Sequence, residues 1–222
     1  MDNYIVSARK YRPSTFQSVV GQKALTQTLK NAIDAGKLAH AYLFCGPRGV
    51  GKTTCARIFA KTINCLSPAA DGEACNQCES CQAFNEQRSY NIHELDAASN
   101  NSVDDIRQLV DQVRIPPQIG KYKVYIIDEV HMLSTSAFNA FLKTLEEPPA
   151  NSLIILIGTS ATKQLPTIRS RCQTFRFQPL ATDAIAQILL DRGRVETPEE
   201  ADSVARRSRG SLVEAEKALD RP

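Results

Sequence analysis

The chain has 222 residues, 42% of them hydrophobic, and its formal net charge is +3. This length and composition predict a soluble globular protein of one or two domains, and the small charge means that any contact with nucleic acid must be local. The sequence has no run of 18 apolar residues, and its start, MDNYIVSARK, lacks the apolar core of a signal peptide. We therefore expect a cytoplasmic protein without a membrane span, whose seven cysteines stay reduced.

Apolar segments alternate with helical patterns through the first two thirds of the chain. We expect strands at Ala41–Cys45, Ile92–Leu95, Val124–Asp128 and Leu153–Gly158. Three of these are nearly continuous apolar runs, as in strands that are buried on both faces. Apolar residues spaced by three, four and seven positions predict helices from Ile106 to Val113 and from Phe138 to Leu145. This alternation predicts an α/β fold with a parallel sheet covered by helices on both faces.

Beyond Phe177 no strand is expected. Three helices are predicted there: one capped by Thr182, one that starts with a capping box of Thr197 and Glu200, and one that follows Ser211. We therefore divide the chain into an α/β domain at residues 1–178 and a small helical domain at residues 179–222.

Residues 46–53, GPRGVGKT, have the GxxxxGK[ST] phosphate-binding pattern. They follow the first apolar strand and precede a helical stretch, which is the context this pattern requires. The glycines allow the backbone to wrap a polyphosphate, Lys52 suits the β- and γ-phosphates, and Thr53 suits Mg²⁺. The alternative is a glycine turn that only joins a strand to a helix. We expect ATP and Mg²⁺ to bind at Gly46, Pro47, Arg48, Gly49, Val50, Gly51, Lys52, Thr53 and Thr54.

Two carboxylates end the third apolar segment, in the sequence VYIIDEVH. Asp128 can hold Mg²⁺ through water, and Glu129 can polarise an attacking water as a general base. The alternative is a pair of solvated charges at a strand end. The upstream phosphate loop favours the catalytic interpretation, because phosphoryl transfer needs both parts. The role of His131 stays open.

Four cysteines have the spacing C-x9-C-x2-C-x2-C, namely Cys65, Cys75, Cys78 and Cys81. Four thiolates suit a tetrahedral structural Zn²⁺ site. The segment LSPAADGEA between the first two is too polar to form a core, so a metal would organise a zinc module at about residues 65–81. An iron–sulfur cluster and four unrelated thiols are the alternatives.

These motifs, together with ARKYRPSTF, ELDAASN and FNAFLKTLEEPP, resemble the gamma/tau subunits of the bacterial DNA polymerase III clamp loader. The resemblance implies an AAA+ P-loop NTPase with a zinc-binding insertion and a helical lid domain. It places Arg12, Pro13, Val20 and Gln22 near the adenine and Thr159 at the sensor-1 position. It also implies that Arg171, in the motif Ser170-Arg171-Cys172, reaches into the ATP site of a neighbouring subunit. After about residue 150, the segment IRSRCQTF also resembles the delta-prime subunit.

The resemblance further implies the function and the partners. We expect an ATPase in a hetero-oligomer of clamp-loader subunits, which loads the sliding clamp onto primed DNA and contacts the primer–template through its phosphates. Arg107 and Lys143 are candidate DNA contacts, although two solvated helix charges are an equal alternative.

The chain departs from the family pattern at two points, of which Val213 favours a second hypothesis, whereas the intact GKT motif and the pair Asp128 and Glu129 favour the ATPase. Val213 stands where the family has the sensor-2 arginine. The sequence stops at Pro222, before the collar domain expected from the family, so we expect either a fragment or an abridged protein. The second hypothesis is a non-hydrolysing structural subunit that supplies Arg171 to a neighbour. A helicase, suggested by DEVH, is disfavoured because about 45 helical residues after Gln178 cannot form a second RecA-like domain.

Overall fold

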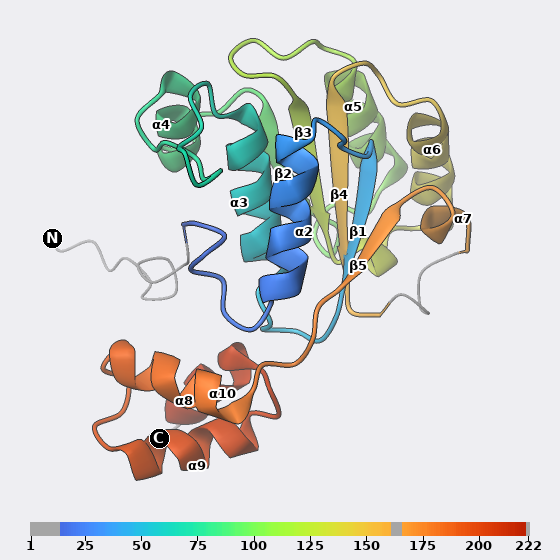
Figure 1. The fold of residues 1–222 in the computed structure, drawn as a ribbon. Helices are drawn as coiled ribbons and strands as arrows, with labels where there is room; N and C mark the ends of the chain where they lie inside the picture. The colour runs from blue at the N-terminus through green and yellow to red at the C-terminus, as the bar shows by residue number, and fades with distance from the viewer. Residues whose placement is uncertain (1–13, 161–165, 221–222) are drawn as a thin grey trace, which may run out of the picture.

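The computed structural model describes residues 14–160 and 166–220 (Figure 1). Its centre is a five-stranded parallel sheet. In spatial order the strands are β2 (Ile92–Asp96), β3 (Lys123–Asp128), β4 (Ser152–Gly158), β1 (Ala41–Cys45) and β5 (Gln173–Arg176). The four strands expected from the apolar segments are confirmed, each to within one residue at either end.

The fifth strand, β5, was not predicted. It pairs with β1 at an edge of the sheet, where Tyr42 lies opposite Gln173 and Cys45 opposite Arg176. Three of its four residues are exposed, so it lacks the apolar run that identifies a buried strand. Backbone hydrogen bonds to β1 form this strand, and its amino-acid composition does not predict them.

Helices cover both faces of the sheet. On one face lie α2 (Lys23–Asp34) and α3 (Lys52–Asn64), and on the other lie α5 (Val103–Val113) and α6 (Thr135–Glu146) (Figure 1). Side chains of β1 alternate accordingly: Tyr42 packs with α3, and Leu43 packs on the α5 and α6 side. Full burial of one such large side chain stabilises the fold by roughly 1.5–3 kcal/mol. The remaining short elements are α4 (Glu79–Asn85), the 3-10 helix η1 (Val130–Met132) and α7 (Pro166–Arg169).

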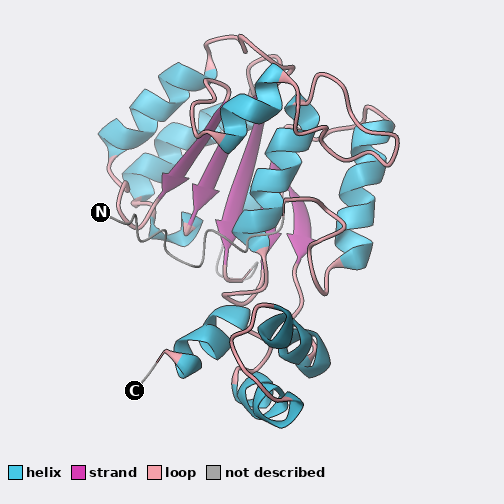
Figure 2. Cartoon of the chain, turned by 90° about the vertical axis from the view of Figure 1, so that its left-hand side faces the viewer, coloured by secondary structure: helices cyan, strands magenta, loops and turns pink. Residues whose placement is uncertain are grey.

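Three helices follow the sheet: α8 (Thr182–Asp191), α9 (Pro198–Arg207) and α10 (Leu212–Leu219). They enclose a hydrophobic cluster of their own that includes Ile185, Leu189 and Val204. They lie beyond the carboxyl ends of the strands, toward which the arrowheads point (Figure 2). This separate cluster supports the division at residues 178 and 179, which stays a prediction.

The predicted starts of these helices are partly wrong. Ser211 caps α10 and Thr197 caps α9, as expected, through bonds from the backbone N–H groups three residues on. Thr182, however, is the first helical residue of α8, and Ala181 is the N-cap without a side-chain bond. At α9 the capping box is incomplete, because the Glu200 carboxylate accepts from the backbone of Glu196 instead.

Two further findings concern the whole described chain. Strand β4 pairs with both β1 and β3, so residues after 150 complete the centre of the sheet.

Within residues 14–160 and 166–220, no helix combines the length and the apolar character needed to cross a bilayer.

Candidate nucleotide-binding site

The phosphate loop connects the end of β1, in the middle of the sheet, to the start of α3. Gly51 immediately precedes α3 with φ 97°, a conformation that side chains other than hydrogen rarely adopt. The first N–H groups of a helix lack intrahelical acceptors and carry partial positive charge. The start of α3 is therefore suited to an anion such as a polyphosphate.

Lys52 is folded onto this loop. Its ammonium group donates to the backbone oxygen of Gly46 and, at 2.6 Å, to that of Pro47. Burial lowers the pKa of Lys52, and the nearby carboxylates of Asp128 and Glu129 oppose that shift. The ammonium group of Lys52 is thus bound by two uncharged backbone oxygens. A phosphate oxygen can replace them, because it carries a negative charge.

Thr53 and Asp128 form a hydrogen-bonded pair. The Thr53 hydroxyl donates to Oδ2 of Asp128 at 2.7 Å, which joins the start of α3 to the end of β3. A hydroxyl and a carboxylate are the hard oxygen ligands that Mg²⁺ prefers. The pair therefore fits the predicted magnesium site.

Glu129 has an unusual backbone conformation, with φ 52° and ψ 45°. A left-handed conformation in a residue other than glycine costs about 1–3 kcal/mol, and such residues concentrate at functional sites. Its carboxylate lies 3.3 Å from the guanidinium of Arg48 and 3.3 Å from Nε2 of His131. His131, whose role the sequence left open, therefore contacts the candidate general base.

A cleft of about 650 Å³ lies at this loop. Its lining includes residues 48–54, Asp128, Glu129 and the segment Ser18–Val20, but not Gly46 or Pro47. Val20 thus lies in the cleft, as predicted, whereas Arg12 and Pro13 fall outside the described residues. Gln22, beside this segment, donates to the backbone oxygen of Gln178 at 2.8 Å, just before the three last helices.

Helices α8 and α10 line the other side of the cleft, whereas α9 contributes no residue to it. The backbone N–H of Leu212 donates to the Gly49 oxygen at 3.1 Å. A Cβ on Gly49 would lie 2.3 Å from the Ser211 hydroxyl, so this close approach requires glycine. Val213 lines the cleft, as do Arg192 and Glu216, which form an ion pair at 2.6 Å. Sequence reasoning missed these last two residues, because no motif marks them.

Thr159 and Arg171 lie in different places. Cys45 pairs with Gly158, so Thr159 follows at the level of Gly46, the first residue of the phosphate loop. Arg171 bonds to the carboxylate of Glu146 on α6 and, at 2.8 Å, to the Thr167 oxygen. It is not among the residues that line the cleft, so the fold does not bring Arg171 to its own phosphate loop.

The two candidate DNA contacts are exposed residues on α5 and α6. The side chain of Arg107 is 70% exposed and lies 3.6 Å from Asp104, and Lys143 is exposed as well. Their position is compatible with either prediction, contact with phosphates or solvation.

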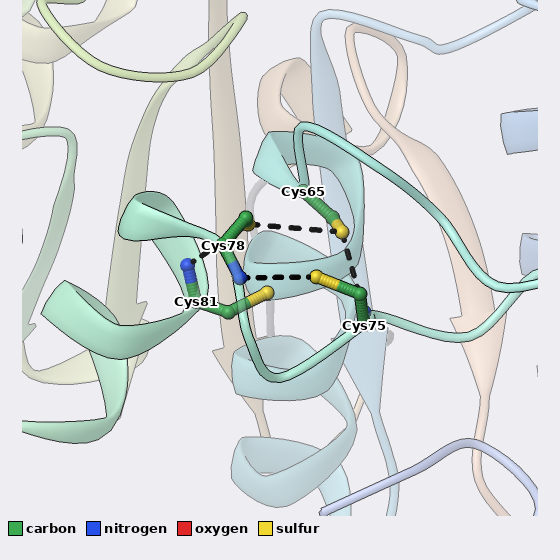
Figure 3. A group of neighbouring side chains, drawn as sticks. All are labelled: Cys65, Cys75, Cys78 and Cys81. Carbon is green, nitrogen blue, oxygen red and sulfur yellow. Dashed lines mark hydrogen bonds between the residues drawn. The ribbon is translucent and has the colours of Figure 1, made fainter.

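The four cysteines of residues 65–81 come together next to α3 and α4 (Figure 3). Their sulfur atoms all lie within 4.8 Å of one another. Four thiolates around Zn²⁺ at about 2.3 Å require sulfur separations of about 3.8 Å, so small adjustments suffice. The arrangement fits a tetrahedral metal.

Backbone N–H groups are directed at these sulfur atoms. Cys75 accepts from the amides of Gln77 at 3.4 Å and Cys78 at 3.2 Å, and Cys65 accepts from the amide of Cys75 at 3.3 Å. Hydrogen bonding, first from Ser67 and then from these amides, lowers the pKa of Cys75 to about 5. Burial raises the pKa of Cys65 and Cys81. A cation would favour the thiolate form at all four.

Metal analysis of protein purified without chelator is expected to find one zinc per chain. Cys78→Ser should lower this content and the melting temperature, because a structural zinc contributes to folding free energy. In a domain of this size, each kcal/mol lost lowers the melting temperature by about 2–4 °C. Cys172→Ser, a cysteine outside the cluster, is the matched control and should retain the metal. Protein without zinc whose four thiols titrate freely in the folded state would contradict the site.

A parallel sheet, a phosphate loop after β1, an acidic pair at the end of β3 and a helical region bonded to the loop define a P-loop protein with the AAA+ fold. The sequence model described as "DNA polymerase III, delta subunit" matches residues 21–181, and the chain belongs to this family.

Curated relatives agree with this assignment. The DNA polymerase III subunit tau of Bacillus subtilis is 51% identical over 183 residues, which cover 82% of this chain and 32% of the relative. The subunit tau of Escherichia coli is 43% identical over 217 residues, or 96% of this chain and 34% of the relative. The resemblance to gamma/tau subunits is therefore confirmed, and the chain spans about a third of the length of these relatives.

Solved structures show the same fold. The Thermotoga maritima RuvB Holliday junction branch migration motor superposes with a TM-score of 0.66 at 20% identity, covering 95% of this chain and 64% of that one. A DNA polymerase III gamma subunit-related protein from Thermotoga maritima gives a TM-score of 0.56 at 23% identity, covering 80% and 57%. The predicted AAA+ α/β fold is confirmed, and the zinc insertion and the lid domain stay predictions.

Proposed function

We propose that this chain is an ATP-driven subunit of the bacterial DNA polymerase III clamp loader. The observation that carries the proposal is the cleft in which Lys52 and the Thr53–Asp128 pair lie together, opposite residues of α8 and α10. The names of the relatives, DNA polymerase III tau subunits, support the same assignment. The partners we propose are the other clamp-loader subunits, the sliding clamp, and primer–template DNA contacted through its phosphates.

The residues of the cleft, together with Thr159, have different roles in ATP hydrolysis. Lys52 and the N–H groups at the start of α3 bind the β- and γ-phosphates. Mg²⁺, held by Thr53 and Asp128, neutralises phosphate charge when it is bound. Glu129 accepts a proton from the attacking water, and Thr159 contacts the γ-phosphate or that water. The hydrogen bond between Leu212 and Gly49 links the phosphate loop to α10, so movement of the loop reaches the helical lid.

A structural subunit that does not hydrolyse ATP is the second candidate. The observation in its favour is Val213, which brings an apolar side chain to the cleft where the family has arginine. ATP turnover, measured alone and then with partner subunits, clamp and primed DNA, separates the two. The motor predicts turnover that rises on assembly, whereas the structural subunit predicts none from this chain.

Lys52→Ala is expected to weaken ATP binding at least tenfold, which is about 1.4 kcal/mol. The substitution removes the cation that neutralises the phosphates. Titration with a fluorescent ATP analogue measures the dissociation constant, and the exposed Lys37→Ala is the control for loss of a lysine elsewhere. Equal affinity in Lys52→Ala and the parent would defeat the assignment of the phosphate loop.

A further inference from the structure

A buried carboxylate lies in the insertion that carries the four cysteines, at about residues 65–81, and does not line the cleft described above. Glu73 is only 4% exposed and stands two positions before Cys75. A buried charge is costly unless it is paired and hydrogen-bonded. Glu73 meets this need with groups from two distant segments. Its oxygens accept from the backbone N–H groups of Phe16 at 3.0 Å and Gln17 at 3.1 Å, and Lys30 on α2 lies 3.4 Å away.

The segment that Glu73 holds leads directly into the cleft. Residues 15–19 form a turn, in which the N–H of Val19 donates to the Phe16 oxygen at 3.1 Å. Phe16 is 1% exposed and belongs to the core beneath α2 and α3. Ser18, Val19 and Val20 then line the cleft. The carboxylate therefore binds the first N–H groups of the turn whose last residues form part of the cleft wall.

The position of Glu73 is set by the insertion. Its backbone oxygen accepts from Ala69 at 2.9 Å, and its N–H donates to the Asp71 carboxylate at 3.0 Å. Ala74, the next residue, packs with Cys65 and Cys81. Cys65 in turn directly follows α3, the helix that begins at the phosphate loop. The insertion is thus connected to two segments that reach the cleft, namely α3, whose first residues belong to the phosphate loop, and the turn that Glu73 binds.

We propose that Glu73 is a positioning residue for the nucleotide, and this inference rests on the proposed function. It holds the turn at residues 15–19 so that Val19 and Val20 form an apolar wall against the base. These side chains offer nothing to a phosphate, whereas a purine buries apolar surface against them. Glu73 therefore supports binding of the base, and Lys52 supports binding of the phosphates.

Glu73→Gln tests this assignment. The amide keeps the shape but not the charge, and its NH₂ group faces backbone donors that need an acceptor. Calorimetric titration with Mg-ATP and with Mg-tripolyphosphate, which lacks the base, measures both dissociation constants below the melting temperature. We expect the constant for ATP to rise about tenfold, or 1.4 kcal/mol, with that for tripolyphosphate unchanged. The zinc content should equal that of the parent.

Glu79→Gln is the matched control, because Glu79 is an exposed glutamate of the same insertion, and it should change neither constant. Lys30→Gln leaves in place both hydrogen bonds from the backbone to Glu73. It should weaken the binding of ATP but not of tripolyphosphate, and by less than Glu73→Gln does. If Glu73→Gln does not fold, Lys30→Gln is the variant in which the dissociation constants for ATP and tripolyphosphate are compared with those of the parent. Equal ATP affinity in Glu73→Gln and the parent, or an equal loss for both ligands, would overturn the inference alone. A parent chain that binds neither ligand would overturn the proposed function and this inference with it.

Discussion

Glu129→Gln is expected to bind ATP normally, while its rate of ATP hydrolysis falls by about a hundredfold or more. The amide preserves the size of the side chain but cannot accept a proton from water. The position supports this role, because Glu129 follows the strand that ends in Asp128, and its 25% exposed side chain lines the cleft. Its left-handed backbone conformation is of the kind that concentrates at functional sites.

Single-turnover measurements with saturating ATP separate this effect from a loss of affinity. The exposed Glu199→Gln on α9 is the control and should hydrolyse ATP at the parental rate. Equal turnover in Glu129→Gln and the parent would assign catalysis to another group, or show that the activity belongs to a contaminant.

The parts of the site that local spacing encodes could be predicted from the sequence. The phosphate loop follows one apolar strand, Asp128 and Glu129 stand at the end of another, and parallel strands bring their carboxyl ends to one edge. The cysteine spacing encodes a cluster in the same way, because two intervening residues place neighbouring thiols in one turn.

The missed features depend on contacts between distant or polar segments. Strand β5 is polar because it lies at an edge, so its composition resembles a loop. Arg192 and Glu216 are 24 positions apart and meet in the cleft only through helix packing. Glu73 and Phe16 are separated by 57 positions, and no periodicity relates a carboxylate to backbone N–H groups at such a distance.

Arg171 is expected to act in the ATP site of a neighbouring subunit, so that the isolated chain hydrolyses ATP slowly. In the described residues Arg171 pairs with Glu146, away from the cleft of its own chain. The two side chains are 29% and 48% exposed, and ion pairs of this kind contribute only about 0–1 kcal/mol. Arg171 can therefore leave Glu146 for a phosphate of a neighbour at little cost.

An arginine supplied in trans can increase phosphoryl transfer by about 10³–10⁵. We therefore expect near-basal turnover in dilute solution and a large increase on assembly with partner subunits. Arg171→Ala should bind ATP normally. The neighbouring site that Arg171 faces should lose the increase in turnover that assembly produces. The exposed Arg169→Ala, two positions away on α7, is the matched control and should retain it.

Mixing two inactive variants gives the most direct test of action in trans. Lys52→Ala chains lack a working phosphate loop but keep Arg171, and Arg171→Ala chains have the opposite defect. If Arg171 acts on a neighbour, an assembly of both variants contains interfaces where an intact loop meets an intact arginine, and turnover returns in part. If Arg171 acts within its own chain, no interface in the mixture is complete and turnover stays at the level of the separate variants. Dilute parent chain that sediments as a monomer and yet hydrolyses ATP at the rate of the full assembly would likewise exclude action in trans, because no neighbour is present to supply the guanidinium group.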